Sequence, residues 1–167
     1  MRLLGLDPGL RITGWGVLDA LDNRLIWVAD GIVTSDDKLT LAERLAQLNR
    51  GVSAVIERFS PDEAAVEETF VNRNPASTLK LGQARGAVLT AAGLAGLPVA
   101  EYATRLVKKS VVVTGAAEKA QIGMMVRQLL PACEIATEDA ADALAVAICH
   151  AHHRKHAGLL LKIAGVR

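Results

Sequence analysis

Four acidic side chains close apolar or alanine-rich segments of this chain. Asp7 ends the first apolar run, and Glu67 ends a second one. Asp139 and Asp142 lie three residues apart in an alanine-rich stretch. A buried carboxylate is costly unless it is paired or binds a metal, and Mg²⁺ is bound by carboxylate oxygens. The four acids therefore predict a divalent-metal site suited to phosphate chemistry.

Each of these acids also has a purely structural explanation. An Asp-Pro-Gly sequence is favourable in turns, so Asp7 alone fits a turn as well as a metal site. Acids are common in the first turn of a helix, which suits Asp139 better than Asp142. Glu67 and Glu68 point to opposite faces of a strand, so only one of them can join Asp7. The metal-site prediction depends on all four acids meeting in one pocket.

Hydrophobic patterning places these acids on an α/β fold. Strands are predicted over 2–7, 13–20, 24–33, 64–66 and 98–102. Helices are predicted over 39–59 (with an interruption at Gly51), over 76–94, from a cap at Thr104, up to Leu130, and from a cap at Thr137. The helix before the fourth strand makes that strand parallel to the first, which brings their final acids close together. The order predicts a five-stranded mixed sheet flanked by helices.

Length and composition restrict the class of protein. The chain has 167 residues, and 51% of them are hydrophobic, which fits one domain with a sizeable core. No run approaches the roughly 20 apolar residues of a membrane helix, and an acid at position 7 does not fit a signal peptide. Cys133 and Cys149 lack the spacing of a metal site. We expect a cytoplasmic protein with reduced thiols and no membrane association.

Positive charge is concentrated in one part of the chain. Between Phe70 and Pro131, eight bases stand against two acids, a net charge of +6, so the rest of the chain carries −5. Such a segment can bind nucleic-acid phosphates. On charge alone, solvated side chains on helices are the more common explanation.

Six blocks of the sequence resemble the RuvC family of Holliday junction resolvases. In order, they are GLDPGLRITGWG, VEETF, LKLGQARG, EYATRLVKKSVV, GAAEKAQI and DAADALAVAI. The resemblance implies an RNase H-like nuclease domain over 1–157, with 158–167 as a tail outside it. It also implies a homodimer that acts in homologous recombination and DNA repair. Such a homodimer nicks two opposed strands of a four-way DNA junction symmetrically, with Mg²⁺, and the RuvA-RuvB branch-migration complex is an expected partner.

The resemblance assigns roles to individual acids. The catalytic and metal-binding acids of the family match Asp7, Glu67, Asp139 and Asp142, and Glu68 is left out. Two Mg²⁺ ions per site are expected, with Mn²⁺ as a substitute. Asp7 would bridge them, because it ends the central strand. One ion would activate water and the other would stabilise the leaving oxygen.

The resemblance also implies DNA contacts. Phe70 matches an aromatic side chain that stacks on bases at the crossover, although its pattern alone favours a core position. Lys108 and Lys119 match lysines near the active site, although Lys119 alone would also fit a solvated helix surface. Other bases are expected to contact backbone phosphates: Arg73, Lys80, Arg85, Arg105 and Lys109.

Two other functions remain open from the residues alone. An actin-like or sugar-kinase ATPase shares the Asp-x-Gly hairpin at Asp7, but that fold normally needs a second half. A non-catalytic DNA-binding module explains the positive segment but leaves the acids without a purpose. The histidines at 150, 152, 153 and 156 have no further ligand in view, so no zinc site is predicted.

Overall fold

The secondary structure follows the predicted order. The computed structural model describes residues 1–22, 24–68, 74–112 and 119–163. The strands are β1 (Arg2–Asp7), β2 (Ile12–Leu21), β3 (Arg24–Thr34), β4 (Glu63–Glu67) and β5 (Val99–Tyr102). The helices are α1 (Leu41–Phe59), α2 (Pro75–Leu94), α3 (Thr104–Val111), α4 (Lys119–Leu129) and α5 (Glu138–Ile163).

The five strands form one mixed sheet in the order β3-β2-β1-β4-β5, so the predicted sheet is confirmed. β1 pairs antiparallel with β2 and parallel with β4, and β4 pairs parallel with β5. The parallel pairs follow from α1 and α2, which carry the chain back before each new strand begins. The carboxyl ends of β1, β4 and β5 therefore meet at one edge of the sheet.

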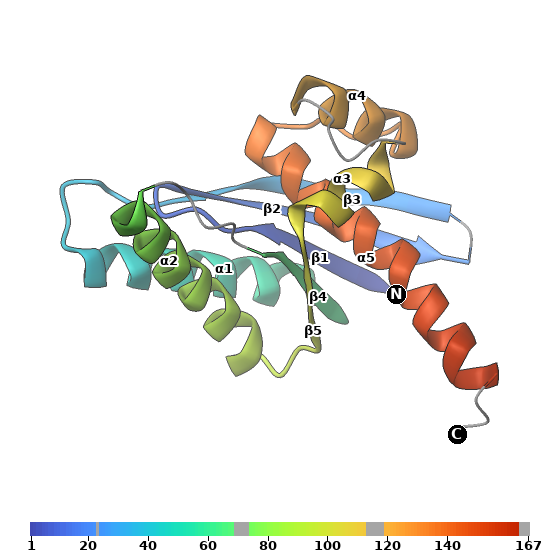
Figure 1. Cartoon of the computed structure of the whole chain (residues 1–167), viewed down its shortest axis with the longest axis horizontal. Coiled ribbons are helices and arrows are strands. Elements are labelled where there is room, and N and C mark those ends of the chain that lie inside the picture. The colour runs from blue at the N-terminus through green and yellow to red at the C-terminus, as the bar shows by residue number, and fades with distance from the viewer. Residues whose placement is uncertain (23, 69–73, 113–118, 164–167) are drawn as a thin grey trace.

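Helices cover both faces of the sheet (Figure 1). α1 and α2 pack on the face that carries Leu4 and Leu6 of β1. α3, α4 and α5 pack on the other face, which carries Leu3. Alternation along β1 places Asp7 on the same face as Leu3, on the side of α5. In the described part of the chain, no helix is long and apolar enough to span a membrane.

Glycines let α5 lie directly on the backbone of the central strands. A Cβ on Gly5 of β1 would collide with the carbonyl of Ala143, and one on Gly14 of β2 would collide with the carbonyl of Asp139. Small residues on both sides thus bring the first turns of α5, with their two acids, close to the end of β1.

The structure tests three predictions about the helices: two N-caps and one interruption. Thr137 does cap α5, since its hydroxyl accepts a hydrogen bond of 3.1 Å from the Ala140 backbone. The cap at Thr104 is wrong: Ala103 is the N-cap of α3, and Thr104 is the first helical residue. The interruption at Gly51 is also wrong. α1 continues through Gly51 without a break. A Cβ at this position would collide with Val33 of β3, so the glycine allows α1 to lie close to β3.

The predicted boundary after residue 157 does not coincide with the end of an element. α5 runs without a break to Ile163. The domain division therefore stays a prediction based on resemblance.

Candidate active site

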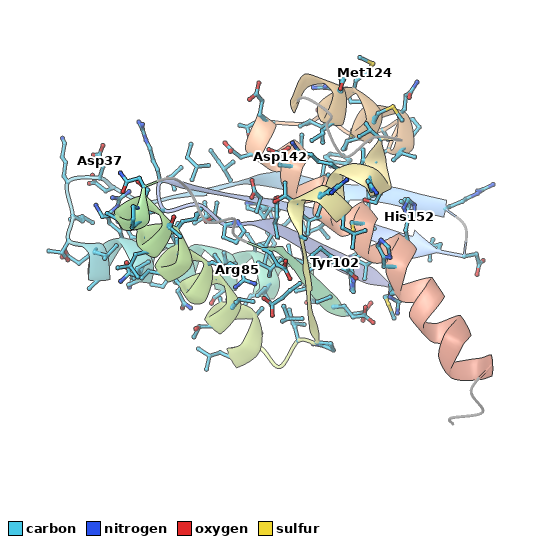
Figure 2. The ribbon with its side chains drawn as sticks, viewed as in Figure 1. Asp37, Arg85, Tyr102, Met124, Asp142 and His152 are labelled. Carbon is cyan, nitrogen blue, oxygen red and sulfur yellow. The ribbon has the colours of Figure 1, made fainter. Side chains whose placement is uncertain are left out.

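The acids converge at the carboxyl edge of the parallel strands. Asp7 ends β1 and Glu67 ends the neighbouring β4. Together with Asp142 of α5 they line an open pocket of about 240 Å³, whose wall includes Thr104 and Lys108 of α3. Two strands and two helices thus contribute polar groups to one pocket. Figure 2 labels Asp142 among the side chains of this region.

Asp139 and Glu68 lie differently from these acids. Asp139 does not line the pocket, although its charge is close enough to raise the pKa of Asp7. Glu68 follows the end of β4 and is exposed. The geometry therefore groups Asp7 with Glu67 rather than Glu68, as the alternation along the strand requires.

The carboxyls of the pocket are difficult to ionise together, because they are partly buried and close to one another. Burial raises the pKa of Asp7 to about 8, and the charges of Glu67, Asp142 and Asp139 add to this increase. Burial also raises the pKa of Glu67, against hydrogen bonds from Thr104 and Asp7 that lower it. Asp7 and Glu67 share a hydrogen bond, and burial together with the charge of Asp142 favours holding a proton on this pair of carboxyls.

This donor set fits a hard divalent cation. All of the acidic groups offer carboxylate oxygens, and their mutual repulsion is relieved by positive charge. Among the described residues, no three acids are yet arranged as a complete set of ligands around one point.

The raised pKa of Asp7 predicts how stability depends on pH without metal. A carboxyl whose folded pKa lies above its unfolded value stabilises the fold fully below the unfolded pKa, here 3.8. That stabilisation is lost as pH rises to about 8. In EDTA, the free energy of unfolding should fall over this range, and Asp7→Asn should raise it at pH 8 by up to roughly 5 kcal/mol, since each pKa unit corresponds to about 1.4 kcal/mol. Urea unfolding of both proteins measures this, and equal stability at pH 8 would contradict the effect.

Thr104 is a site residue that the sequence reasoning did not find. It was considered only as a cap, yet it lines the pocket and donates a hydrogen bond to Glu67. A signal was present, because Thr104 comes two residues after the last residue of β5, whose end lies beside that of β4. The carboxyl ends of adjacent parallel strands are where such residues gather.

The predicted DNA-contacting bases are distributed unevenly around the pocket. Lys108 lines it, while Lys80, Arg105 and Lys109 are exposed. Lys119 begins α4, and its side chain lies outside the described part of the structure. Phe70 and Arg73 also lie outside the described residues.

Arg85 differs from the other bases because its guanidinium is already bonded within the fold. It forms an ion pair with Glu101 of β5, and its Nε donates a hydrogen bond of 3.2 Å to the backbone carbonyl of Glu67. Arg85, labelled in Figure 2, therefore connects α2 to the ends of β4 and β5.

Comparisons with known proteins agree on one family. The family model described as crossover junction endodeoxyribonuclease RuvC matches residues 3–150. A protein of that name from Paramagnetospirillum magneticum is 71% identical over 154 residues, which cover 92% of this chain and 93% of the relative. Another, from Rhodospirillum rubrum, is 67% identical over 166 residues, 99% of this chain and 98% of the relative.

A solved structure agrees with the sequence comparisons. The structure described as T. thermophilus RuvC in complex with Holliday junction substrate superposes with a TM-score of 0.86 at 34% identity. The match covers 94% of this chain and 96% of that one. The similarity thus extends over the sheet and the helices on both of its faces.

Proposed function

The chain belongs to the RuvC family of crossover junction endodeoxyribonucleases, and on this premise we propose that it resolves Holliday junctions in recombination and repair. Its mixed sheet and flanking helices form the RNase H-like fold that the resemblance implied. One observation carries the proposal: Asp7, Glu67 and Asp142, from three separate elements, line one pocket beside Lys108. The location expected from the sequence, the cytoplasm, is part of the proposal.

The reaction is the hydrolysis of one phosphodiester bond in each of two opposed strands. Asp7, Glu67 and Asp142 would hold Mg²⁺, with Asp139 one turn earlier on α5. When bound, the cations supply an activated water and positive charge for the leaving oxygen. Two ions per site, and Mn²⁺ as a substitute, are the finer part of the proposal.

The chain's own groups hold the substrate and these acids in place. Lys108 faces the same pocket as the carboxylates, so its ammonium can neutralise a phosphate placed there. Thr104 donates to Glu67 and thereby keeps that carboxylate oriented. Lys119, at the start of α4, and the remaining predicted bases would contact phosphates of the junction arms. The role of Phe70 as a stacking residue belongs to the same proposal.

A homodimer suits a two-fold junction, because each protomer would cut one of the two opposed strands. Helix α2 offers a surface for it. Gly82, Gly86 and Gly93 have open space around their Cα atoms, and Leu79 and Leu94 are 67% and 81% exposed. Small and apolar residues of this kind allow two helices to pack closely. Docking of the RuvA-RuvB complex rests on family membership alone.

A cleavage assay on a synthetic four-way junction tests the function. The purified chain is incubated with the junction and with a matched linear duplex, each with and without Mg²⁺. We expect paired nicks at symmetric positions in the junction only, and only with Mg²⁺. Junction binding without any Mg²⁺-dependent nicking would identify a DNA-binding module instead. Binding of ATP would favour the actin-like alternative.

A further inference from the structure

A cluster of hydrogen-bonded polar side chains joins α5 to the first residue of β4, at the opposite end of that strand from Glu67, and extends to Tyr102 at the end of β5. His150 of α5 is 6% exposed, and both of its ring nitrogens have partners. Nδ1 lies 2.9 Å from the hydroxyl of Tyr102, and Nε2 lies 2.8 Å from Oε2 of Glu63. Arg154, one turn further along α5, donates to both oxygens of Glu63 at 3.0 and 2.9 Å.

The bonding in this cluster has a single consistent direction. A carboxylate only accepts, so Nε2 of His150 carries the proton that Glu63 receives. Nδ1 is then an acceptor, and the Tyr102 hydroxyl donates to it. Burial lowers the pKa of His150, which agrees with a neutral imidazole at pH 7. Both ring nitrogens of His150 and both carboxylate oxygens of Glu63 have partners, and no buried side-chain nitrogen or oxygen in the described part of the chain lacks one.

The cluster and the acidic pocket form two links between the same pair of elements. Glu63 and Glu67 are the first and last residues of β4 and share one face. They are roughly 13 Å apart along the strand. Asp142 and His150 are separated by eight residues of α5, about 12 Å along the helix. Asp142 lies at the Glu67 end and His150 at the Glu63 end, so α5 runs opposite to β4.

The two links act in opposite senses when no cation is bound. At the pocket, Asp142 of α5 lies with Asp7 and Glu67 of the strands, and carboxylates gathered in this way repel one another, which favours a larger separation of the start of α5 from the strands. At the other end, Glu63 is bonded to both His150 and Arg154, which pulls the helix onto β4. The distance from Glu63 to Glu67 along β4 nearly equals the distance from His150 to Asp142 along α5. The bonds to Glu63 therefore also fix how far α5 is shifted along β4, and with it the position of Asp142 beside Glu67.

Tyr102 connects His150 to the part of the pocket formed by the end of β4 and the start of α3. It pairs with Glu67 in the β-ladder, and its carbonyl accepts a hydrogen bond of 2.8 Å from the Glu68 backbone. Two residues later, Thr104 reaches Glu67 itself. The residue whose hydroxyl is held by His150, Tyr102, is therefore only two positions from Thr104, which orients Glu67.

We propose that Glu63, His150 and Arg154, with Tyr102, form a positioning clamp that holds α5 against β4 and β5, so that the acids stay preorganised for a divalent cation. None of these residues lines the acidic pocket. They act through the separation of Asp142 from Asp7 and Glu67. The inference rests on the proposed metal-dependent function and assigns that site a set of supporting residues about 12 Å from it.

Binding of Mn²⁺ to the DNA-free protein, followed by the electron paramagnetic resonance of the free ion, tests the clamp. Glu63→Gln keeps the side-chain volume but removes the charge that holds Arg154. We expect its Kd for Mn²⁺ to rise by about 10-fold, the usual effect of losing a group that supports metal ligands. The control is Asp19→Asn, which breaks the ion pair with Arg2 at the other end of β1. It should leave the Kd unchanged.

Thermal unfolding in EDTA separates positioning from stability. A merely structural role would lower the Tm of Glu63→Gln without changing its Kd for Mn²⁺, and that result would overturn the clamp. If Glu63→Gln does not fold, Arg154→Gln replaces it with the same two outcomes, because the Arg154 side chain is 28% exposed. Absence of Mn²⁺ binding by the unsubstituted protein would instead overturn the proposed function, and the clamp with it.

Discussion

Replacing Asp7 with asparagine is expected to lower junction cleavage by at least about 10³-fold, or roughly 4 kcal/mol of transition-state stabilisation. Asp7 lies between Glu67 and the acids of α5, and its pKa responds to all three of them. An amide keeps the shape of the carboxyl but removes the charge that a cation needs.

Junction binding should survive this substitution, because phosphate affinity comes from the bases rather than the acids. Gel-shift titration in EDTA measures binding, and nicking with Mg²⁺ measures catalysis on the same preparation. Glu68→Gln is a matched control: Glu68 adjoins Glu67 but is exposed and does not line the pocket. It should cleave like the unsubstituted protein. Asp7→Asn that cleaves within 10-fold of the unsubstituted protein would disprove the assignment of Asp7 to the metal.

Gly14→Ala is expected to lower cleavage by about 10²-fold without contacting substrate or metal. The added Cβ would collide with the carbonyl of Asp139, at the start of α5. The clash is with backbone, so the first turn of the helix must move away from β2. Asp142 is carried with it, and a displacement of about 1 Å in a catalytic group is enough for a loss of this size.

The same substitution should destabilise the fold by about 1–3 kcal/mol, the usual cost of overpacking. Urea unfolding measures this loss, and cleavage below the transition separates it from the loss of activity. Gly123→Ala is the control, because a Cβ on Gly123 of α4 meets only the end of the flexible Arg127 side chain, at an ordinary contact distance of 3.5 Å. Full cleavage by Gly14→Ala would show that the position of the α5 start does not limit the reaction.

The clamp and the contact at Gly14 both control where α5 lies on the sheet, one at the middle of the helix and the other at its start. Gly14 lets the start of the helix approach β2, while Glu63 holds its middle against β4. Both act on the distance between Asp142 and the strand ends. If both predictions hold, combining Gly14→Ala with Glu63→Gln should give a non-additive loss of Mn²⁺ affinity, since coupled sites share one structural response.

The sequence by itself determined the order of the elements and the acids that could meet. Alternation in the strands and helical spacing are local patterns, and a helix between two strands makes them parallel. Asp7 and Glu67 could therefore be placed at one edge of the sheet, and alternation limited the pair to one of the two neighbouring glutamates. The blocks shared with the RuvC family then identified the family.

Only the tertiary structure decided which distant groups touch. The clamp joins Glu63 to His150, 87 residues later, and no local period encodes that contact. Likewise, the sequence suggested only a helix cap for Thr104, whereas the pairing of β5 with β4 brings it to Glu67. Asp139 and Asp142 lie three residues apart in one alanine-rich stretch, yet only Asp142 lines the pocket. The packing of α5 on Gly5 and Gly14 sets the rotation and depth of that helix, and these depend on contacts between segments far apart in the chain.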